Sequence, residues 1–341
     1  MKSIRKIAVI GAGSWGTALA KLLAENNDEV CLWAYEAEIV AGINQQHKNP
    51  LFLNAVELPK NLTATNDFQE ALCGAGVVVS VVPSHVLRLV WQQAAEFLEK
   101  ESLLISCTKG IEIAGFKLMH QVLDDCLPNH PAKQRAVLSG PSFAKEVAEN
   151  LPTSVVIAGI DSSTTKKLQA VFRTQNFLPF LSDDIIAVQV GGAVKNVIAL
   201  AAGLSDGLQL GHNAQAAIVT RGLYEMIKVG KALGANELTF AGLSGMGDLV
   251  LTATCGLSRN YSVGKAIGEG DGAKKVLGDT QMVAEGMETA HAVSALGKKF
   301  AIELPICDAV AAILRGELSP LEAVHQLTSR SLGDEMGALH S

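Results

Sequence analysis

Short apolar runs alternate with segments of helical period in the first half of the chain. The apolar runs predict strands at residues 7–10, 30–33, 77–82, 102–107, 136–139 and 154–158. Between the first two runs, Ala18, Leu19, Leu22 and Leu23 recur at the spacing of one helix face. Runs this continuous are typical of strands buried on both faces, as in a parallel sheet covered by helices. The alternation therefore predicts a doubly wound α/β domain.

The pattern changes near Asp183. Beyond it, Ala-rich segments of helical period predict helices at 185–204, 213–233 and 285–300, with almost no strand pattern. Pro305 is expected in the first turn of a further helix, where its missing N–H is harmless. We therefore expect an all-α second domain, with the two domains spanning residues 1–188 and 189–341. A chain of 341 residues suits two domains.

Composition narrows the function classes. Apolar residues make up 48% of the chain and charged residues 18%, which is ordinary for a globular protein with a large core. The formal net charge is −6 and argues against general binding to nucleic acid or to anionic membranes. A small anionic substrate stays possible, because a few Lys and Arg side chains in one cleft suffice to bind phosphate.

No targeting or membrane segment is apparent. The apolar run behind the basic residues 1–6 is too short for a signal peptide, and no apolar stretch approaches the length that spans a bilayer. The six cysteines are scattered without a CxxC pair, which indicates free thiols in a reducing compartment. We expect a cytoplasmic protein, and the scattered His residues predict no metal site.

The strongest local signal is GAGSWG at residues 11–16, which follows the first predicted strand and opens the first predicted helix. Gly11 allows a tight turn, Gly13 lets the backbone approach a pyrophosphate, and Gly16 lets helix and strand pack closely. The helix N-terminus presents unpaired N–H groups to the phosphates. A GxGxxG pattern alone is weak evidence for a dinucleotide site. Its place directly after a predicted strand, however, predicts a Rossmann-like domain that binds NAD or NADP.

The end of the second predicted strand normally carries the residue that contacts the adenosine ribose. Glu36 lies in that window and suits a ribose 2′-hydroxyl, which favours NAD. A solvated acid at the start of a helix fits Glu36 equally well. No Arg stands at the strand end to hold the 2′-phosphate of NADP, yet the sequence leaves both coenzymes open.

Three further predicted strands end in polar or glycine-rich loops, at residues 83–85, 108–110 and 139–145. Ligands of an open parallel sheet bind beyond the carboxyl ends of the strands, so we expect these loops to converge on the nucleotide. Lys109 is a cation at such an end and suits a carbonyl or a phosphate, with an ordinary surface lysine as the alternative. His85 is interpreted as a loop histidine without a role in proton transfer.

Lys195 stands in an apolar helical segment, where Gly191, Gly192 and Ala199 share its face and leave room for a ligand. Apolar surroundings disfavour the charged ammonium and favour proton exchange, so Lys195 is a candidate general acid or base. The alternative is a lysine whose stem is buried and whose head reaches water.

Two polar clusters follow. Asp248 comes directly after the glycine-rich residues 242–247, and Ser258, Arg259 and Asn260 precede a helical stretch. Arg makes bidentate contacts to phosphate, and Ser and Asn add neutral hydrogen bonds. Taken alone, Arg259 fits a surface position better than a phosphate site. The case for a phosphate contact comes from the polar residues beside it in the sequence.

Over nearly its whole length, the sequence resembles the bacterial-type NAD(P)-dependent glycerol-3-phosphate dehydrogenases. The matching motifs keep their order: GAGSWGTALA at 11–20, VVPSH at 81–85, TKG at 108–110, SGPSFAKEVA at 139–148, GGAVKNVIALAAGLSDG at 191–207, GLSGMGDLVLT at 242–252, SRN at 258–260 and VAEG at 283–286. The resemblance implies a coenzyme-binding first domain, a helical substrate domain and an active site between them. It also implies reversible hydride transfer between NAD(P)H and dihydroxyacetone phosphate, which gives sn-glycerol 3-phosphate for glycerophospholipid synthesis.

The resemblance carries roles onto individual residues. It implies that Lys195 donates and accepts the proton, that Lys109 contacts both substrate and coenzyme, and that Asp248 orients Lys195 or a substrate hydroxyl. The other implied substrate contacts are Gly140, Ser142, Ser258, Arg259 and Asn260. Besides the glycines at 11, 13 and 16, the implied coenzyme contacts are Ser14, Trp15, Tyr35, Ala144, Arg259, Val283 and Glu285.

Tyr35 departs from the family pattern. Family members commonly carry a basic residue or His at this position, which helps hold the 2′-phosphate of NADP. Tyr35 has no positive charge, so a preference for NADP does not carry over. The family also suggests a homodimer, although no stretch of this chain proves one.

Other interpretations fit parts of the sequence. A related two-domain dehydrogenase for a hydroxyacid or a sugar phosphate shares the GxGxxG start and the helical second half. A regulator that senses NAD(H) without turnover has to treat Lys109, Lys195, Asp248 and Arg259 as coincidence. A methyltransferase shares only the glycine-rich turn.

Overall fold

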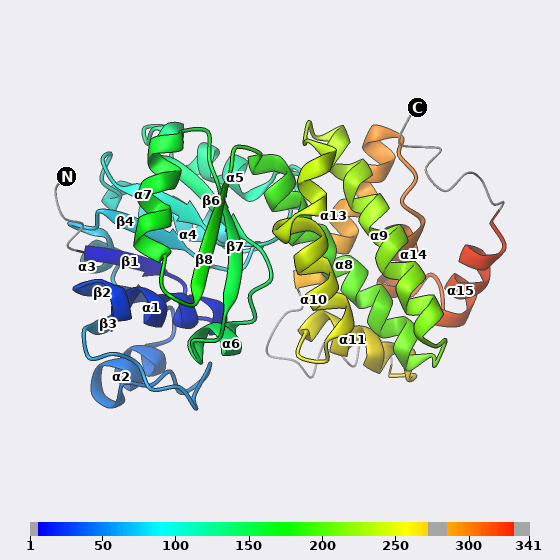
Figure 1. The fold of residues 1–341 in the computed structure, drawn as a ribbon, viewed down its shortest axis with the longest axis horizontal. Helices are drawn as coiled ribbons and strands as arrows, with labels where there is room; N and C mark the ends of the chain where they lie inside the picture. Colours follow the sequence, from blue (N-terminus) through cyan, green and yellow to red (C-terminus); the bar gives the residue numbers. More distant parts are fainter. Residues whose placement is uncertain (1–5, 272–284, 331–341) are drawn as a thin grey trace. The chain divides into compact units, whose positions relative to one another are not determined.

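The chain divides into two units, each described here by itself, in a computed structural model that describes residues 6–271 and 285–330 (Figure 1). The first unit comprises the chain up to Glu112 together with Lys117–Gln189. The second comprises the chain from Val190 onward together with Ile113–Phe116. The short excursion at 113–116 has no counterpart in the sequence pattern.

An eight-stranded sheet forms the centre of the first unit, in the order β3-β2-β1-β4-β5-β6-β7-β8. Its strands are β1 (Lys6–Ile10), β2 (Glu29–Trp33), β3 (Leu62–Thr65), β4 (Val77–Ser80), β5 (Leu103–Ser106), β6 (Arg135–Ser139), β7 (Thr153–Ala158) and β8 (Phe177–Ser182). Neighbouring strands from β3 to β6 are parallel, β7 is antiparallel to β6, and β8 is parallel to β7. All six predicted strands are confirmed.

The sheet differs from the prediction in three respects. The strand at 154–158 (β7) runs antiparallel to β6, because the chain returns through the short helix α6 (Ala144–Ala148) without a full crossover helix. The sequence pattern missed β3, which has only four residues. It also missed β8, which Pro179 interrupts; proline is tolerated there because β8 is the edge strand.

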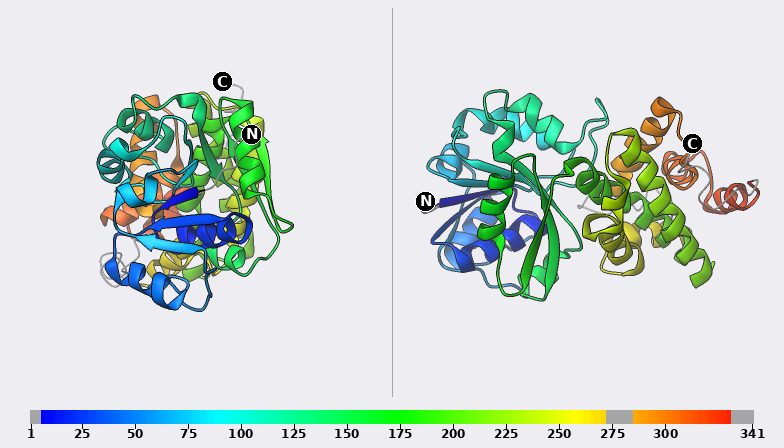
Figure 2. Two further views of the ribbon diagram at one scale, coloured as in Figure 1. Left: turned by 90° about the vertical axis from the view of Figure 1, so that its left-hand side faces the viewer. Right: turned by 45° about the horizontal axis from the view of Figure 1, so that its top comes forward.

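Helices cover both faces of this sheet (Figures 1 and 2). Ile7 and Val9 of β1 point into the apolar core of one face, while Ala8 and Ile10 point into the core of the other. The first core is completed by α1 (Ser14–Asn26), α2 (Ala37–Gln46), α6 and α7 (Ser162–Phe172). The second is completed by α3 (Phe68–Leu72), α4 (Leu87–Ala94) and α5 (Met119–Cys126). Short 3₁₀ turns occupy η1 (Ala95–Phe97) and η2 (Ala132–Gln134).

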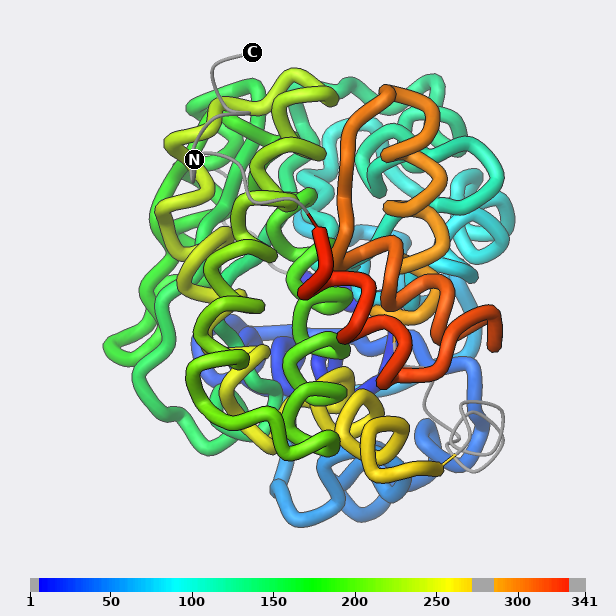
Figure 3. Tube along the Cα trace, turned by 90° about the vertical axis from the view of Figure 1, so that its right-hand side faces the viewer, coloured from blue at the N-terminus to red at the C-terminus, as the bar shows by residue number. Residues whose placement is uncertain are grey.

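The second unit is helical, and from Asp183 onward the described residues form only helices and turns. Its elements are α8 (Ile185–Gly207, which begins in the first unit), α9 (His212–Ala232), η3 (Glu237–Ala241), the π-helical turn η4 (Leu243–Gly247), α10 (Asp248–Thr254), α11 (Arg259–Gly268), α13 (Glu285–Phe300), α14 (Pro305–Arg315) and α15 (Pro320–Thr328). The three predicted helices are confirmed, and Pro305 opens α14 as expected. In Figure 3, α14 and α15 lie side by side. The predicted fold class, α/β followed by all-α, is therefore confirmed.

Glycines let α8 approach α11 backbone to backbone. A Cβ atom at Gly203 would lie 2.0 Å from the carbonyl oxygen of Tyr261, and one at Gly264 would lie 2.2 Å from that of Leu200. These distances exclude any side chain at either position. The small residues along α8 therefore serve helix packing.

The expectation that no stretch is long and apolar enough to span a bilayer is wrong for α8. By length and composition alone, Ile185–Gly207 meets that requirement. However, 89% of its most apolar window is buried inside the protein. We interpret α8 as the central helix of the second unit, apolar on all sides because neighbouring helices surround it.

Candidate active site

The glycine-rich loop between β1 and α1 leaves open space at the start of α1. Gly11 has a φ of 116°, and a Cβ there would lie 2.9 Å from the backbone of Val81. A Cβ at Gly16 would lie 1.9 Å from the carbonyl oxygen of Gly11, so helix and loop touch. At Gly13, by contrast, no other described atom comes within 4 Å of a Cβ. The loop therefore fits a diphosphate laid against Gly13 and the N–H groups of α1.

Ser14 and Trp15 are the first two residues of α1. The indole of Trp15 packs against the core beneath the loop, and its Nε1 is buried without a hydrogen bond to any described residue. A buried N–H donor without a partner is costly, so this one is suited to an acceptor atom of a ligand.

Asn49 supports the loop from behind, and sequence reasoning missed it. Its Nδ2 donates to the carbonyl oxygen of Ala12 at 2.9 Å and to Thr17 Oγ1 at 2.8 Å. Its Oδ1 accepts from the N–H groups of Leu51 and Phe52. Asn49 is fully buried. The local sequence carries no sign of this contact, because it joins residues that are 37 positions apart.

The end of β2 presents Tyr35 and Glu36. The Tyr35 side chain is 82% exposed, which is unusual for a residue of this size. Glu36 is exposed at the N-cap of α2, and its carboxylate forms no capping hydrogen bond with the described helix. Both side chains are therefore accessible to a ligand, and both interpretations of Glu36 stay open.

The loops after β5 and β6 meet at the carbonyl oxygen of Gly140. Lys109 Nζ donates to it at 3.2 Å and Ser142 Oγ at 2.8 Å. Thr108, beside Lys109, donates to the carbonyl oxygen of Val82 after β4 at 2.8 Å. The structure thus brings Lys109, Gly140 and Ser142 together at the carboxyl ends of adjacent parallel strands. Lys109 is half-buried at this edge.

Ala144 is the first residue of α6, and α6 packs against α1. The segment that carries Gly140 and Ser142 therefore continues directly into α6, which packs against the helix that begins at the glycine-rich loop. Gly140 has a φ of 139°, and a Cβ there would lie 3.0 Å from Val155. Glycine is needed at this turn for both reasons.

In the second unit, Lys195 of α8 forms a buried ion pair with Asp248 of α10. Lys195 Nζ lies 2.6 Å from Asp248 Oδ1 and 2.8 Å from Thr252 Oγ1. Thr252 Oγ1 in turn donates to the carbonyl oxygen of Asp248 at 2.6 Å. The exposed fraction is 7% for Lys195 and 1% for Asp248. Two hydrogen bonds thus fix the direction of the ammonium group.

This pair corrects the expectation that Lys195 has purely apolar surroundings. A buried carboxylate compensates its charge, which favours the ammonium form that burial alone would disfavour. Gly191 does not provide room for a ligand either. A Cβ at this position would lie 2.2 Å from the carbonyl oxygen of Ser244, so Gly191 allows α8 to pack against η4. Sequence reasoning missed Thr252, although its spacing of four from Asp248 on one helix was a usable signal.

The start of α11 lies close to the start of α13. Ser258 is the N-cap of α11 and its side chain accepts from the N–H of Tyr261 at 3.3 Å. Asn260 Oδ1 accepts from the N–H of Gly286 at 3.1 Å. A Cβ at Gly286 would lie 2.8 Å from the carbonyl oxygen of Asn196, the residue after Lys195. This contact brings Asn260 and the first turn of α13 beside the helix that carries Lys195.

Two further predicted residues of this unit stand at the starts of helices. Arg259 is the exposed first residue of α11 and Glu285 the half-buried first residue of α13. Val283 lies outside the described residues. Among residues 6–271 and 285–330, no group of three His, Cys, Asp or Glu side chains is placed to hold a metal ion.

A mostly parallel sheet with a glycine-rich loop after its first strand defines a dinucleotide-binding protein. The helical unit with its buried Lys–Asp pair adds a group able to transfer a proton, so the class is that of the NAD(P)-dependent two-domain oxidoreductases. Within that class, the chain belongs to the NAD-dependent glycerol-3-phosphate dehydrogenase family. The model of the family's N-terminal part matches residues 6–165, and that of the C-terminal part matches residues 184–325.

Individual relatives cover almost the whole chain. It is 46% identical over 330 residues to the glycerol-3-phosphate dehydrogenase [NAD(P)+] of Citrifermentans bemidjiense, covering 97% of this chain and 98% of that protein. The identity to the enzyme of the same name from Geobacter metallireducens is 47% over 332 residues, covering 97% and 99%. The crystal structure of glycerol-3-phosphate dehydrogenase from Coxiella burnetii superimposes with a TM-score of 0.91 at 40% identity, covering 96% of this chain and 99% of that one.

Membership of this family excludes two of the alternative functions that the sequence left open. The chain is an NAD(P)-dependent dehydrogenase, so neither the methyltransferase nor the sensor without turnover applies. The bracketed coenzyme in the relatives' names covers both NAD and NADP.

Proposed function

We propose that this protein interconverts dihydroxyacetone phosphate and sn-glycerol 3-phosphate with NAD(P)(H), and that Lys195 is its proton donor and acceptor. The observation that carries the role of Lys195 is the buried pair with Asp248, in a chain that matches both halves of the family. We also assign the first unit to coenzyme binding and the second to the substrate, close to the boundary expected after residue 188.

The glycine-rich loop supports the coenzyme assignment. The open space at Gly13 fits a dinucleotide, as does Trp15 Nε1, which has no hydrogen-bond partner among the described residues. Gly11 and Gly16 shape the turn, and Ser14 stands at the start of α1. When bound, the reduced nicotinamide supplies the hydride that C2 of the ketone accepts. The other proposed coenzyme contacts are Tyr35, Lys109, Ala144, Arg259, Val283 and Glu285.

Lys195 would move the proton at the C2 oxygen. In the reductive direction, negative charge develops on this oxygen, and the Lys195 ammonium donates a proton to it. In the oxidative direction, the neutral amine takes the proton back. Asp248 and Thr252 hold Nζ in place, which reduces the reorganisation needed for the transfer. Asp248 is therefore a positioning residue for Lys195.

The other cations would hold the anionic parts of the substrate. Lys109 stabilises the charge that develops on the C2 oxygen, beside Gly140 and Ser142. Arg259, with Ser258 and Asn260, binds the phosphate and so keeps the carbonyl within reach of Lys195.

The test is loss of reduced-nicotinamide absorbance with dihydroxyacetone phosphate, run in parallel with NADH and NADPH. We expect turnover with at least one coenzyme, and a loss of turnover when Lys195 is replaced. Folded protein that binds coenzyme but does not turn over would overturn the substrate assignment. Turnover of a 2-keto acid in its place would favour the hydroxyacid alternative.

The setting of the reaction is also part of the proposal. The proposed product, sn-glycerol 3-phosphate, would supply glycerophospholipid synthesis in the cytoplasm. The six cysteines, all within the described ranges, are free thiols, which supports a reducing compartment. We further propose a homodimer, which light scattering on the purified protein would test.

A further inference from the structure

The chain passes from one unit to the other three times: after Glu112, after Phe116 and after Gln189. The first two crossings belong to one hairpin, residues 111–118. Ile111 and Leu118 form its antiparallel bridge, and the N–H of Glu112 donates to the carbonyl oxygen of Lys117 at 2.9 Å. The stem of this hairpin therefore lies in the first unit, and its tip, residues 113–116, belongs to the second.

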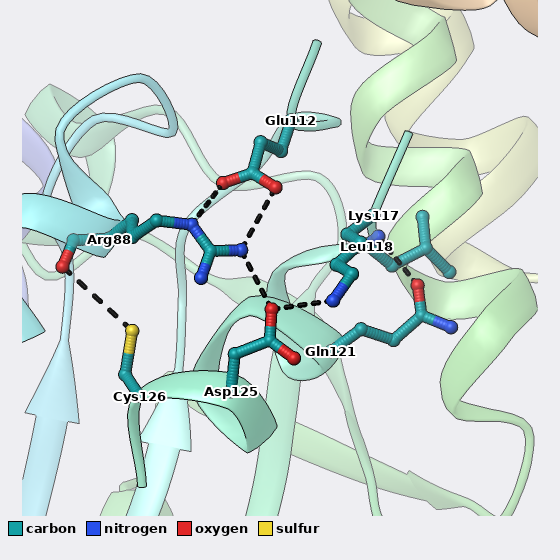
Figure 4. Close-up of polar contacts among 7 residues, drawn as sticks. All are labelled: Arg88, Glu112, Lys117, Leu118, Gln121, Asp125 and Cys126. Carbon is teal, nitrogen blue, oxygen red and sulfur yellow. Dashed lines mark hydrogen bonds and ion pairs between the residues drawn. The ribbon is translucent and has the colours of Figure 1, made fainter. Parts of the chain in front are cut away.

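A network of ion pairs binds both strands of the stem to α4 and α5 (Figure 4). Arg88 of α4 binds Glu112 through two hydrogen bonds, of 2.7 and 3.0 Å, and binds Asp125 of α5 at 2.8 Å. Asp125 also accepts from Lys117 Nζ at 2.5 Å. The positions before the first crossing and after the second are thus held by one Arg and one Asp. Figure 4 also shows Leu118 beside Gln121, whose Oε1 accepts from the Leu118 N–H at 3.0 Å.

The tip of the hairpin is held within the second unit. Lys299 of α13 places its ammonium 5.5 Å from the centre of the Phe116 ring. The stem is therefore attached within the first unit and the tip within the second. The chain crosses between them from one residue to the next, after Glu112 and after Phe116.

The third crossing has a similar attachment, on the same helix. His120 of α5 donates its backbone N–H to Gln189 Oε1 at 3.0 Å, and Gln189 Nε2 donates to His120 Nδ1 at 2.6 Å. Burial lowers the pKa of His120, which favours the neutral ring that can accept this bond.

We propose that Arg88, Asp125 and His120 are positioning residues that fix all three crossings to α4 and α5. Lys109 precedes Glu112 by three residues, and Lys195 follows Gln189 by six. The attachments therefore hold the two chain segments that carry these lysines. This inference rests on the function proposed above, because only a reaction that uses both lysines needs the crossings to be fixed.

Stability alone is a weak explanation for the network. Partly exposed ion pairs contribute little to the free energy of unfolding, because water screens them and ordering long side chains costs entropy. A second bidentate pair, Arg315 with Glu317, has contacts of 2.7 and 2.7 Å in the second unit and lies at no crossing. It offers a control with the same chemistry.

The test compares Arg88→Met, Glu112→Gln and the double variant with Arg315→Met and Glu317→Gln. We expect each change at Arg88 or Glu112 to lower kcat with dihydroxyacetone phosphate by about tenfold or more, since small misplacements of reacting groups have such effects. The double variant should lose no more than the single ones, because the two residues act as one unit. The coenzyme Kd and the unfolding transition should stay as in the wild type, and the control variants should keep full activity.

Gln189→Leu removes the third attachment and tests the proposal independently, should a variant at Arg88 fail to fold. We expect the same pattern: lower kcat with an unchanged coenzyme Kd. Wild-type kcat and KM in these variants would overturn the proposal, as would a loss of activity that merely follows a loss of coenzyme binding or of folding. Wild-type protein without turnover would instead overturn the proposed function, so the two failures are distinguishable.

Discussion

Lys195 Nζ lies 2.6 Å from Asp248 Oδ1 inside the helical unit, with Thr252 as the second acceptor of the ammonium group. The family resemblance implied that Asp248 orients either Lys195 or a substrate hydroxyl, and the structure shows the contact with Lys195. A buried ammonium is tolerated there because a buried carboxylate faces it. The pair therefore affects both the stability of the protein and its proposed chemistry. Substitution of one member at a time distinguishes the two effects.

Replacement of Lys195 by Met should lower kcat by about a hundredfold to ten-thousandfold, the usual contribution of a positioned proton donor. Coenzyme binding, measured by fluorescence titration, should persist because Lys195 is not among the proposed coenzyme contacts. Lys265→Met is the matched control, since Lys265 forms an exposed pair with Asp206 at 2.9 Å. Near-normal turnover of the Lys195 variant would remove this residue from the chemistry.

Asp248→Asn should destabilise the protein as well as slow it. The change leaves the Lys195 ammonium buried without its counter-charge, which costs about 3–5 kcal/mol in the free energy of unfolding. Thr252→Val removes only a neutral partner and should cost about 1 kcal/mol. Urea unfolding of the two variants checks the order. Equal losses would contradict the assignment of Asp248 as the charge partner.

Glu225 predicts a pH dependence of stability. It is buried on α9 and accepts from the N–H groups of Ile306 and Cys307 at the start of α14. Burial raises the pKa of this carboxyl from 4.5 to about 7, and the two N–H groups offset part of the rise. Because the folded state binds the proton more tightly, stability should fall as the pH rises from about 4.5 to about 7. The full change is on the order of 3 kcal/mol.

Glu225→Gln removes this titration. Measured relative to the wild type, the variant should become more stable as the pH rises across that window, and the difference should level off above pH ~7. Glu317→Gln is the control, because Glu317 is exposed on the surface. A wild-type and a Gln variant with parallel stability curves would refute the assignment.

Asn49→Ala should weaken coenzyme binding without touching the coenzyme site itself. Loss of the support to Ala12 lets the glycine-rich loop relax, and we expect the Kd for NADH to rise by about tenfold, equivalent to about 1.4 kcal/mol. Asn44→Ala is matched, since Asn44 also bonds backbone atoms in both directions, at Ala64. An equal effect in both variants would point to general destabilisation.

Glu36→Gln tests the contact with the adenosine ribose. Removing a negative charge beside a 2′-phosphate should raise the ratio of kcat/KM for NADPH to that for NADH by about tenfold. Glu38→Gln, two residues further along in the first turn of α2, serves as the control. An unchanged ratio would favour the other interpretation, in which Glu36 is a solvated acid at the start of α2.

The local parts of the fold were predictable because they depend on residues close together in the chain. The strand at Lys6–Ile10, the glycine-rich turn and helix α1 follow one another within 21 residues. Gly11 and Gly16 have the steric roles that the sequence spacing predicts. The strands β3 and β8 escaped prediction because the first is short and the second is interrupted by Pro179.

The sequence by itself determined the fold class, the position of the dinucleotide loop and the residue types of the candidate site. The tertiary structure alone decided which of these residues meet. Asp248 reaches Lys195 across 53 residues, Asn49 reaches Ala12 across 37, and His120 reaches Gln189 across 69. Periodicity and turn chemistry act over a few residues, whereas such contacts arise only when helices and strands distant in the chain pack together.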